Sequence, residues 1–275
     1  MSERLGSDYL LGSSDAEHER LIRQATLFAP FTERFFRDAG VRSGQCVLDL
    51  GSGVGDVAML VGKLVGPSGA VVGIERDERS LAVARTRARQ AGHKNISFIQ
   101  SDISAISANK SFDAVVGRFI LQFVPNPVNV LRSVVRLLKP GGIVAFQEPS
   151  FAAFVHVCPQ LRLWSAAVAL VCECGRRAGV TVEMGLALHN VFQEVGLPAP
   201  KMYMDMPLGS DPDFIDWVYD LIRTLLPRIH EFNLSMKTLG DVDTLRERLH
   251  HEIASANAVV PVLPLVGALS RLSAS

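Results

Sequence analysis

Hydrophobic residues along this chain follow two alternating patterns. Short, almost continuous apolar runs predict buried strands, and longer segments with an apolar residue every three or four positions predict amphipathic helices. The helices expected between strands are residues 57–65, 77–91, 127–138 and 184–195. The expected strands are residues 46–50, 70–74, 96–100, 114–117, 143–147, 201–206 and 265–272. Strands that alternate with helices in this way predict an α/β fold with a mostly parallel sheet and helices on both faces.

Two segments add to this alternation. Apolar residues recur at helical spacing over residues 17–38, where Pro30 is expected to break or kink the run into two helices. Residues 151–177 form an insertion rich in aromatic and aliphatic side chains. No internal repeat or low-complexity linker divides the chain, so one domain is expected. Its expected parts are residues 1–40, 41–150, 151–182 and 183–275.

The first expected strand runs into a turn with three glycines, Gly51, Gly53 and Gly55, and a helical segment follows. This order places backbone N–H groups beside a ligand, and glycine lets the backbone approach it closely. A dinucleotide-binding turn would carry its third glycine where this chain has Asp56. Asp49, inside the strand, would repel a pyrophosphate but suits a ligand with an ammonium group. The turn therefore predicts a ligand other than a dinucleotide.

Acidic residues end the next two expected strands. Glu75 ends the second strand about 20 residues after the glycines, a place from which a carboxylate accepts hydrogen bonds from both ribose hydroxyls. Asp102 and its apolar neighbour Ile103 follow the third strand, where they can hold the amino group and the face of an adenine. The predicted ligand has an adenine, a free ribose diol and no phosphate near Asp49.

These motifs resemble the class I S-adenosylmethionine-dependent methyltransferases, in a small-molecule branch similar to the enzymes of ubiquinone and menaquinone biosynthesis. Residues 47–55 match the family's glycine motif, residues 111–116 its fourth strand and residues 137–142 the turn before its fifth. The resemblance implies a Rossmann-like, seven-stranded sheet whose last strand is antiparallel and lies between strands five and six. It also implies that residues 1–40 fold over the cofactor as a helical lid and that residues 151–182 form a cap that shapes acceptor specificity.

The resemblance further implies S-adenosyl-L-methionine as the cofactor. The backbone at Gly117 would meet its methionine part, Arg118 would pair with its carboxylate, and Tyr9 and Gln24 of the lid would close over it, although both also suit ordinary surface or packing roles. No metal ligands are expected. The predicted cofactor-binding residues are Asp49, Gly51, Ser52, Gly53, Gly55, Glu75, Arg76, Asp102, Ile103, Gly117, Arg118, Tyr9 and Gln24.

Two residues are candidates for a general base. Glu148 ends the fifth expected strand at the predicted ligand edge, where it can either take a proton or cap a neighbouring loop. His156 lies in the aromatic insertion, where a lone histidine is more often packed and hydrogen-bonded than catalytic. Many relatives carry a histidine shortly after the fourth strand, whereas this chain has Gln122 and Phe123 there.

The composition limits the kinds of molecule that the chain is expected to bind. The 275 residues include 28 basic and 28 acidic side chains, so the chain has no basic footprint for nucleic acid and better fits a small apolar acceptor. The first twenty residues lack the apolar core of a signal peptide, and no apolar run could span a bilayer, which predicts a cytoplasmic protein without membrane insertion. The four cysteines match no disulfide or zinc spacing. A homo-oligomer is compatible with these features.

The sequence therefore predicts a methyltransferase that acts on an oxygen, nitrogen or carbon atom of a small, largely apolar molecule. One form of this prediction is C-methylation of a prenylated or terpenoid acceptor in specialised natural-product metabolism. Two alternatives remain at this stage. One is a non-catalytic module that binds S-adenosylmethionine. The other is a nicotinamide-dependent oxidoreductase, against which Asp49, Asp56 and Asp102 argue.

Overall fold

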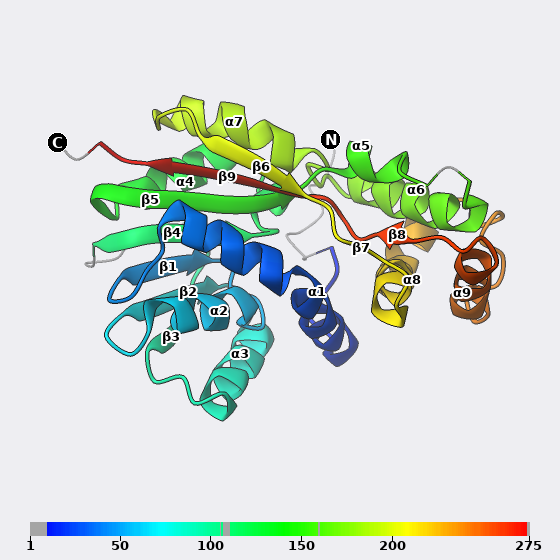
Figure 1. Cartoon of the computed structure of the whole chain (residues 1–275), viewed down its shortest axis with the longest axis horizontal. Helices are drawn as coiled ribbons and strands as arrows, with labels where there is room; N and C mark the ends of the chain where they lie inside the picture. Colours follow the sequence, from blue (N-terminus) through cyan, green and yellow to red (C-terminus); the bar gives the residue numbers. More distant parts are fainter. Residues whose placement is uncertain (1–9, 105, 107–110, 159, 274–275) are drawn as a thin grey trace, which may run out of the picture.

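A computed structural model of the chain describes residues 10–104, 106, 111–158 and 160–273. Within these residues the centre is a seven-stranded sheet in the order β3-β2-β1-β4-β5-β9-β6 (Figure 1). Strand β9 is antiparallel to β5 and β6, and the other neighbouring pairs are parallel. The predicted Rossmann-like sheet is confirmed, including the place of its antiparallel strand. The strands are β1 (Cys46–Leu50), β2 (Ala70–Glu75), β3 (Ile96–Gln100), β4 (Phe112–Arg118), β5 (Leu138–Pro149), β6 (Lys201–Asp205) and β9 (Leu265–Arg271).

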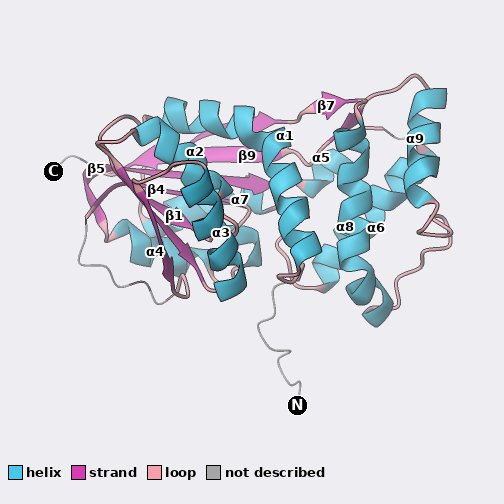
Figure 2. Cartoon of the chain, turned by 90° about the horizontal axis from the view of Figure 1, so that it is seen from below, coloured by secondary structure: helices cyan, strands magenta, loops and turns pink. Residues whose placement is uncertain are grey.

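Helices cover both faces of this sheet, as the alternating pattern predicts (Figures 1 and 2). Side chains of consecutive strand residues point to opposite faces. Val47 and Val116 pack in the core beneath α1 and α2, whereas Leu48 and Val115 pack in the core beneath α4 and α7. The bounds are α1 (Asp15–Ala39), α2 (Asp56–Val65) and α3 (Glu78–Gln90) on one face, and α4 (Pro127–Val135) and α7 (Met184–Val195) on the other.

A second group of helices lies beyond the carboxyl end of β5 (Figure 2). Its buried residues, among them Trp164, Trp217 and Leu249, form a hydrophobic core separate from the two sheet cores. No helix of the described residues is both long and apolar enough to cross a bilayer. The elements here are α5 (Phe151–Val155), α6 (Arg162–Arg177), α8 (Pro212–Glu231), α9 (Leu245–Ser255) and a two-stranded sheet of β7 (Leu208–Gly209) and β8 (Val260–Pro261).

Helix α1 connects these two parts of the molecule (Figure 2). Phe28 is buried in the core of the second helical group, and Phe35 and Phe36 are buried against the sheet. The predicted break at Pro30 is not found, because α1 continues through this residue. The helix bends along its length instead, which agrees with the predicted kink (Figures 1 and 2). A proline inside a helix costs about 3 kcal/mol. Packing of the helix on both sides of Pro30, which is itself exposed, offsets that cost.

Candidate cofactor and acceptor site

The glycine turn lies at the carboxyl edge of the sheet, between β1 and α2. Gly51, Gly53 and Gly55 all have positive φ angles, of 65°, 50° and 90°, which side chains other than glycine rarely adopt. Gly51 is also needed for space, because a Cβ atom there would lie 2.4 Å from Cδ1 of Ile120. The turn thus depends on glycine for both its conformation and its close contact with the segment after β4.

Asp49 is the most unusual group at this edge. Its side chain is 1% exposed, and neither carboxylate oxygen has a hydrogen-bond partner among the described residues. Burial raises the pKa of Asp49 well above its usual range, and the charges of Glu75 and Asp56 add to this shift. Arg118 and the nearby backbone N–H of Ala58 counteract it. Ser52 Oγ, in the turn, is also buried without a partner. Buried polar groups are nearly always paired, so these atoms fit a bound ligand that brings its own cation and hydrogen-bond donors.

Glu75 fixes the turn from the end of β2. Its Oε2 accepts a hydrogen bond from the Gly53 N–H at 3.0 Å, and its Oε1 accepts from the N–H groups of Arg76 and Asp77 at 2.8 and 3.0 Å. A carboxylate offers about four lone-pair sites, so Glu75 retains acceptor capacity for a diol. Arg76 contributes its backbone here, and its side chain is exposed.

Asp102 and Ile103 follow β3 at the same edge. Oδ1 of Asp102 accepts from the N–H and Oγ of Ser104, and these bonds lower the pKa of the carboxyl group. Asp102 is exposed. Ile103 packs partly buried against the core beneath α4 and α7. Both residues therefore lie at the sheet edge expected for the adenine.

Gly117 and Arg118 end β4, next to β1. A Cβ atom at Gly117 would lie 2.6 Å from Cε1 of Phe146, so a larger residue does not fit. Arg118 Nη1 donates to Thr32 Oγ1 of α1 at 2.9 Å, and its guanidinium carbon lies 6.0 Å from the ring centroid of Phe28. Burial lowers the pKa of Arg118, and Asp56 and Asp49 counteract that shift.

The strand register places a third polar side chain, Gln147, on the sheet face that carries Asp49 and Arg118. Asp49 lies opposite Val116, and Arg118 lies opposite Gln147, so the three polar side chains share the face beneath α1 and α2. Gln147 is 1% exposed, and its Oε1 has no partner among the described residues. Sequence reasoning missed Gln147, although an amide within a buried apolar strand was a signal. Thr32 was missed too; its place one helical turn after Phe28 could have indicated it.

Glu148 is fully buried and is held by the chain itself. Oε1 accepts from the N–H groups of Ile120 and Leu121 at 3.0 and 2.8 Å, and Oε2 accepts from the N–H of Gln122 at 3.3 Å. These are the first N–H groups around a short 3-10 helix, η1 (Leu121–Phe123). Burial raises the pKa of Glu148 to about 7, against the lowering effect of these three bonds. The geometry matches the loop-capping alternative; its role as a base stays a prediction.

The remaining predicted residues lie apart from this cluster. His156 is exposed at the end of α5. Gln24 is half-buried in α1, where its Oε1 accepts from Arg20 Nη1 at 2.8 Å and from Trp217 Nε1 of α8 at 3.1 Å. Gln24 thus joins α1 to the second helical group. Tyr9 lies outside the described residues.

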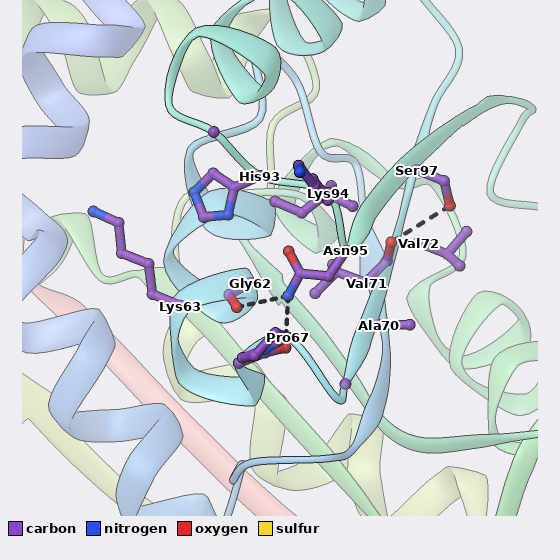
Figure 3. Close-up of a pocket in the computed structure, with 14 residues that line it drawn as sticks. Gly62, Lys63, Pro67, Ala70, Val71, Val72, His93, Lys94, Asn95 and Ser97 are labelled. Atoms are coloured by element: carbon purple, nitrogen blue, oxygen red, sulfur yellow. Dashed lines mark hydrogen bonds between the residues drawn. The ribbon is translucent and has the colours of Figure 1, made fainter.

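A surface depression of about 770 Å³ lies elsewhere, at the opposite edge of the sheet (Figure 3). Gly62, Gly66, His93 and Asn95 are among its lining residues, and Asn95 Nδ2 donates to the carbonyl groups of Gly62 and Gly66 at the end of α2. The carboxyl ends of α2 and α3 both reach this depression. Their partial negative charge is opposed by the side chains of Lys63 and Lys94, which also line the depression. The described residues also contain no cluster of side chains able to hold a metal ion.

Comparison with known proteins agrees with this geometry. A family model described as a methyltransferase domain matches residues 42–196. Demethylmenaquinone methyltransferase of Lactococcus lactis is 38% identical over 112 residues, which cover 40% of this chain and 44% of that protein. The ubiquinone/menaquinone biosynthesis C-methyltransferase UbiE of Pseudomonas entomophila is 39% identical over 117 residues, which cover 41% of this chain and 46% of that protein. The matched part spans less than half the length of these curated relatives.

A solved structure has a fold similar to that of this chain over most of the chain's length. Phosphoethanolamine N-methyltransferase 2 of Haemonchus contortus, in complex with S-adenosylhomocysteine, has a TM-score of 0.55 at 15% identity and covers 89% of this chain and 53% of its own. The family match covers more than half of this chain, within which the cofactor motifs of the sheet all lie. The chain therefore belongs to the methyltransferase-domain family, which confirms the predicted class of S-adenosylmethionine-dependent methyltransferases and the likeness to the enzymes of ubiquinone and menaquinone biosynthesis.

Proposed function

We propose that this chain transfers a methyl group from S-adenosylmethionine to a small, largely apolar acceptor. The observation that carries the proposal is Asp49, a buried carboxylate without a partner beside the glycine turn. An ionised carboxylate that is buried without a partner lowers the stability of the fold unless a cation neutralises it. The ammonium group of the cofactor is such a cation, and the family of the chain makes this cofactor the expected ligand.

The other residues at the edge suit the remaining parts of the cofactor. Arg118 offers a cation for its carboxylate, Glu75 offers acceptors for its ribose, and Asp102 with Ile103 offers an acceptor and an apolar contact for its adenine. When bound, the cofactor supplies a methyl group activated on a sulfonium. The chain's part is to hold both reactants in line, and such positioning supplies about 7–11 kcal/mol at best.

Aromatic side chains support an apolar acceptor. Phe28 and Phe119 stack edge to face at 5.3 Å between centroids, and Phe154 and Trp217 do so at 5.6 Å. These residues come from α1, the segment after β4, α5 and α8, which meet where the sheet edge faces the second helical group. Phe28, Phe154 and Trp217 are buried in the core of the second helical group, and Phe119 is only partly buried against it. A flat or prenylated molecule is the kind of ligand that a partly buried ring such as Phe119 can bind. The relatives named for quinone biosynthesis support the same class of acceptor.

We infer that Glu148 contributes by holding the segment after β4 in place. Both of its oxygens already accept backbone hydrogen bonds, so direct proton removal from an acceptor would compete with them. His156, being exposed, is the other candidate base. An acceptor that reacts at a carbon activated by a phenolate, or at an ionised phenol, depends less on a base held by the enzyme.

An assay of S-adenosylhomocysteine release tests this function. The acceptor panel contains phenols, amines and prenylated aromatic compounds, and the variants are Asp49→Asn, Glu148→Gln and His156→Ala. We expect turnover with aromatic acceptors, a large loss in Asp49→Asn and little loss in His156→Ala. Cofactor binding without turnover on any acceptor would contradict the proposal and favour a non-catalytic cofactor-binding module.

A further inference from the structure

We propose that two copies of this chain associate through β6, with their sheets joined into one continuous sheet across a two-fold axis at Tyr203. Strand β6 ends the strand order of the described sheet, so one side of it has no strand partner among the described residues (Figure 1). Such an edge presents unpaired N–H and C=O groups to a further strand. The sequence of β6 indicates which strand can pair with this edge.

Strand β6 is complementary to itself when paired antiparallel. Its sequence runs from Lys201 to Asp205, with Tyr203 at the centre. Pairing about a two-fold axis places Lys201 opposite Asp205 of the second copy, and Tyr203 opposite its own equivalent. Opposite charges directly across a strand pair are stabilising, whereas like charges are not. Each two-fold contact would contain this ion pair twice.

The side chains also lie on the right face for this contact. Lys201, Tyr203 and Asp205 pair with Leu269, Gly267 and Leu265 of β9. Leu269 and Gly267 lie on the sheet face covered by α1, and Leu265 packs in the core of the second helical group. Asp205 Oδ1 accepts from Arg34 of α1, which leaves Oδ2 for a second cation. Lys201 is exposed and has no acidic partner among the described residues.

Exposed apolar residues continue along the same edge. Tyr203 and Met204 are each 47% exposed, and Leu208 and Val259, in and beside the small sheet of β7 and β8, are 53% and 50% exposed. The chain runs from β6 directly into β7 (Figure 1). Tyrosine and methionine are enriched at protein interfaces, and lysine and aspartate suit the polar rim. The edge therefore combines unpaired strand backbone, several exposed apolar side chains and self-complementary charge.

Cysteine cross-linking tests the register of this contact. In a dimer paired about Tyr203, the two residues 203 lie opposite each other at a separation that a disulfide spans. The two residues 201 lie about 14 Å apart, too far for a disulfide. We expect Tyr203→Cys to form a covalent dimer on mild oxidation and Lys201→Cys, the matched control, to form little more than the wild type, whose cysteines are buried or half-buried. Equal cross-linking of both variants would overturn the register.

A charge swap tests the ion pairs, with analytical ultracentrifugation of the full chain as the measurement. We expect the wild type to sediment as a dimer, and Lys201→Asp and Asp205→Lys each to raise the dimer dissociation constant by about tenfold or more. The double variant Lys201→Asp/Asp205→Lys restores opposite charges across the two-fold axis and should bind more tightly than either single variant, although the change at position 205 also removes the ion pair with Arg34. A wild type that stays monomeric at all concentrations, or a double variant weaker than both single variants, would overturn the proposal. This inference does not depend on the proposed activity.

Discussion

Two buried carboxyl groups at the same edge of the sheet differ in how the chain treats them. Glu148, at the end of β5, accepts three backbone hydrogen bonds, whereas Asp49, at the end of β1, accepts none from the described side chains and backbone. Both are almost inaccessible to solvent, and burial raises the pKa of both. Burial alone therefore does not identify a residue that contacts a ligand. A buried carboxylate without a hydrogen-bond partner is the stronger indication.

The largest expected effect is the loss of stability when the side chain of Glu148 is removed. Glu148→Ala leaves the N–H groups of residues 120–122 without their acceptor, so the free energy of unfolding should fall by about 3 kcal/mol. Glu148→Gln keeps one acceptor oxygen and should cost about 1 kcal/mol. Denaturant unfolding measures both.

The matched change at Asp49 sharpens the contrast. Asp49→Asn breaks no hydrogen bond with the described residues, so its free energy of unfolding should stay within about 1 kcal/mol of the wild type. A loss as large as that of Glu148→Ala would show that Asp49 is a structural group and would remove the contrast.

The pH dependence of cofactor binding should follow Asp49. A cationic ligand favours the ionised carboxylate, whose pKa is raised in the free protein, so binding below that pKa must release a proton. The affinity for S-adenosylhomocysteine should then rise with pH by up to about tenfold per unit and level off above the pKa of Asp49. Isothermal titration calorimetry in buffers of different ionisation enthalpy counts the proton. The Asp49→Asn variant serves as the control and should show neither the slope nor the released proton.

The smallest effect is expected at Gln24. Because its oxygen is shared between Arg20 and Trp217, Gln24→Ala should lower the free energy of unfolding by about 1 kcal/mol. Its affinity for S-adenosylhomocysteine should stay within about twofold of the wild type. A tenfold loss of affinity without loss of stability would restore the role in cofactor contact that the resemblance implied.

The local pattern of the sequence was sufficient to predict the sheet; the cofactor contacts at its carboxyl edge stay a prediction. Periodicity located β1 and α2, and the order of Asp49, the glycines and Glu75 predicted one ligand edge. These features depend on residues close together in the sequence or on a topology that the family shares. The predicted seven-stranded fold and the family are both confirmed.

The sequence pattern did not predict features that depend on contacts between segments far apart in the chain. Pro30 stays inside a helix because Phe28 and Phe36 pack in different cores on either side of it. The partners of Gln24 and Glu148 lie on other elements, at separations of 193 and 26–28 residues for Trp217 and the η1 backbone. No periodicity in a single sequence records which of two buried carboxylates the chain itself will satisfy.

One measurement tests the role of Asp49 most directly. The wild type and Asp49→Asn are each titrated with S-adenosylhomocysteine and with its desamino analogue, which lacks only the ammonium group. An ion-paired hydrogen bond of about 1.5–3 kcal/mol predicts that the wild type prefers S-adenosylhomocysteine by about tenfold to a hundredfold, and that Asp49→Asn loses most of this preference. An equal preference in both proteins would contradict the account, because the ammonium group would then be recognised by some other part of the chain.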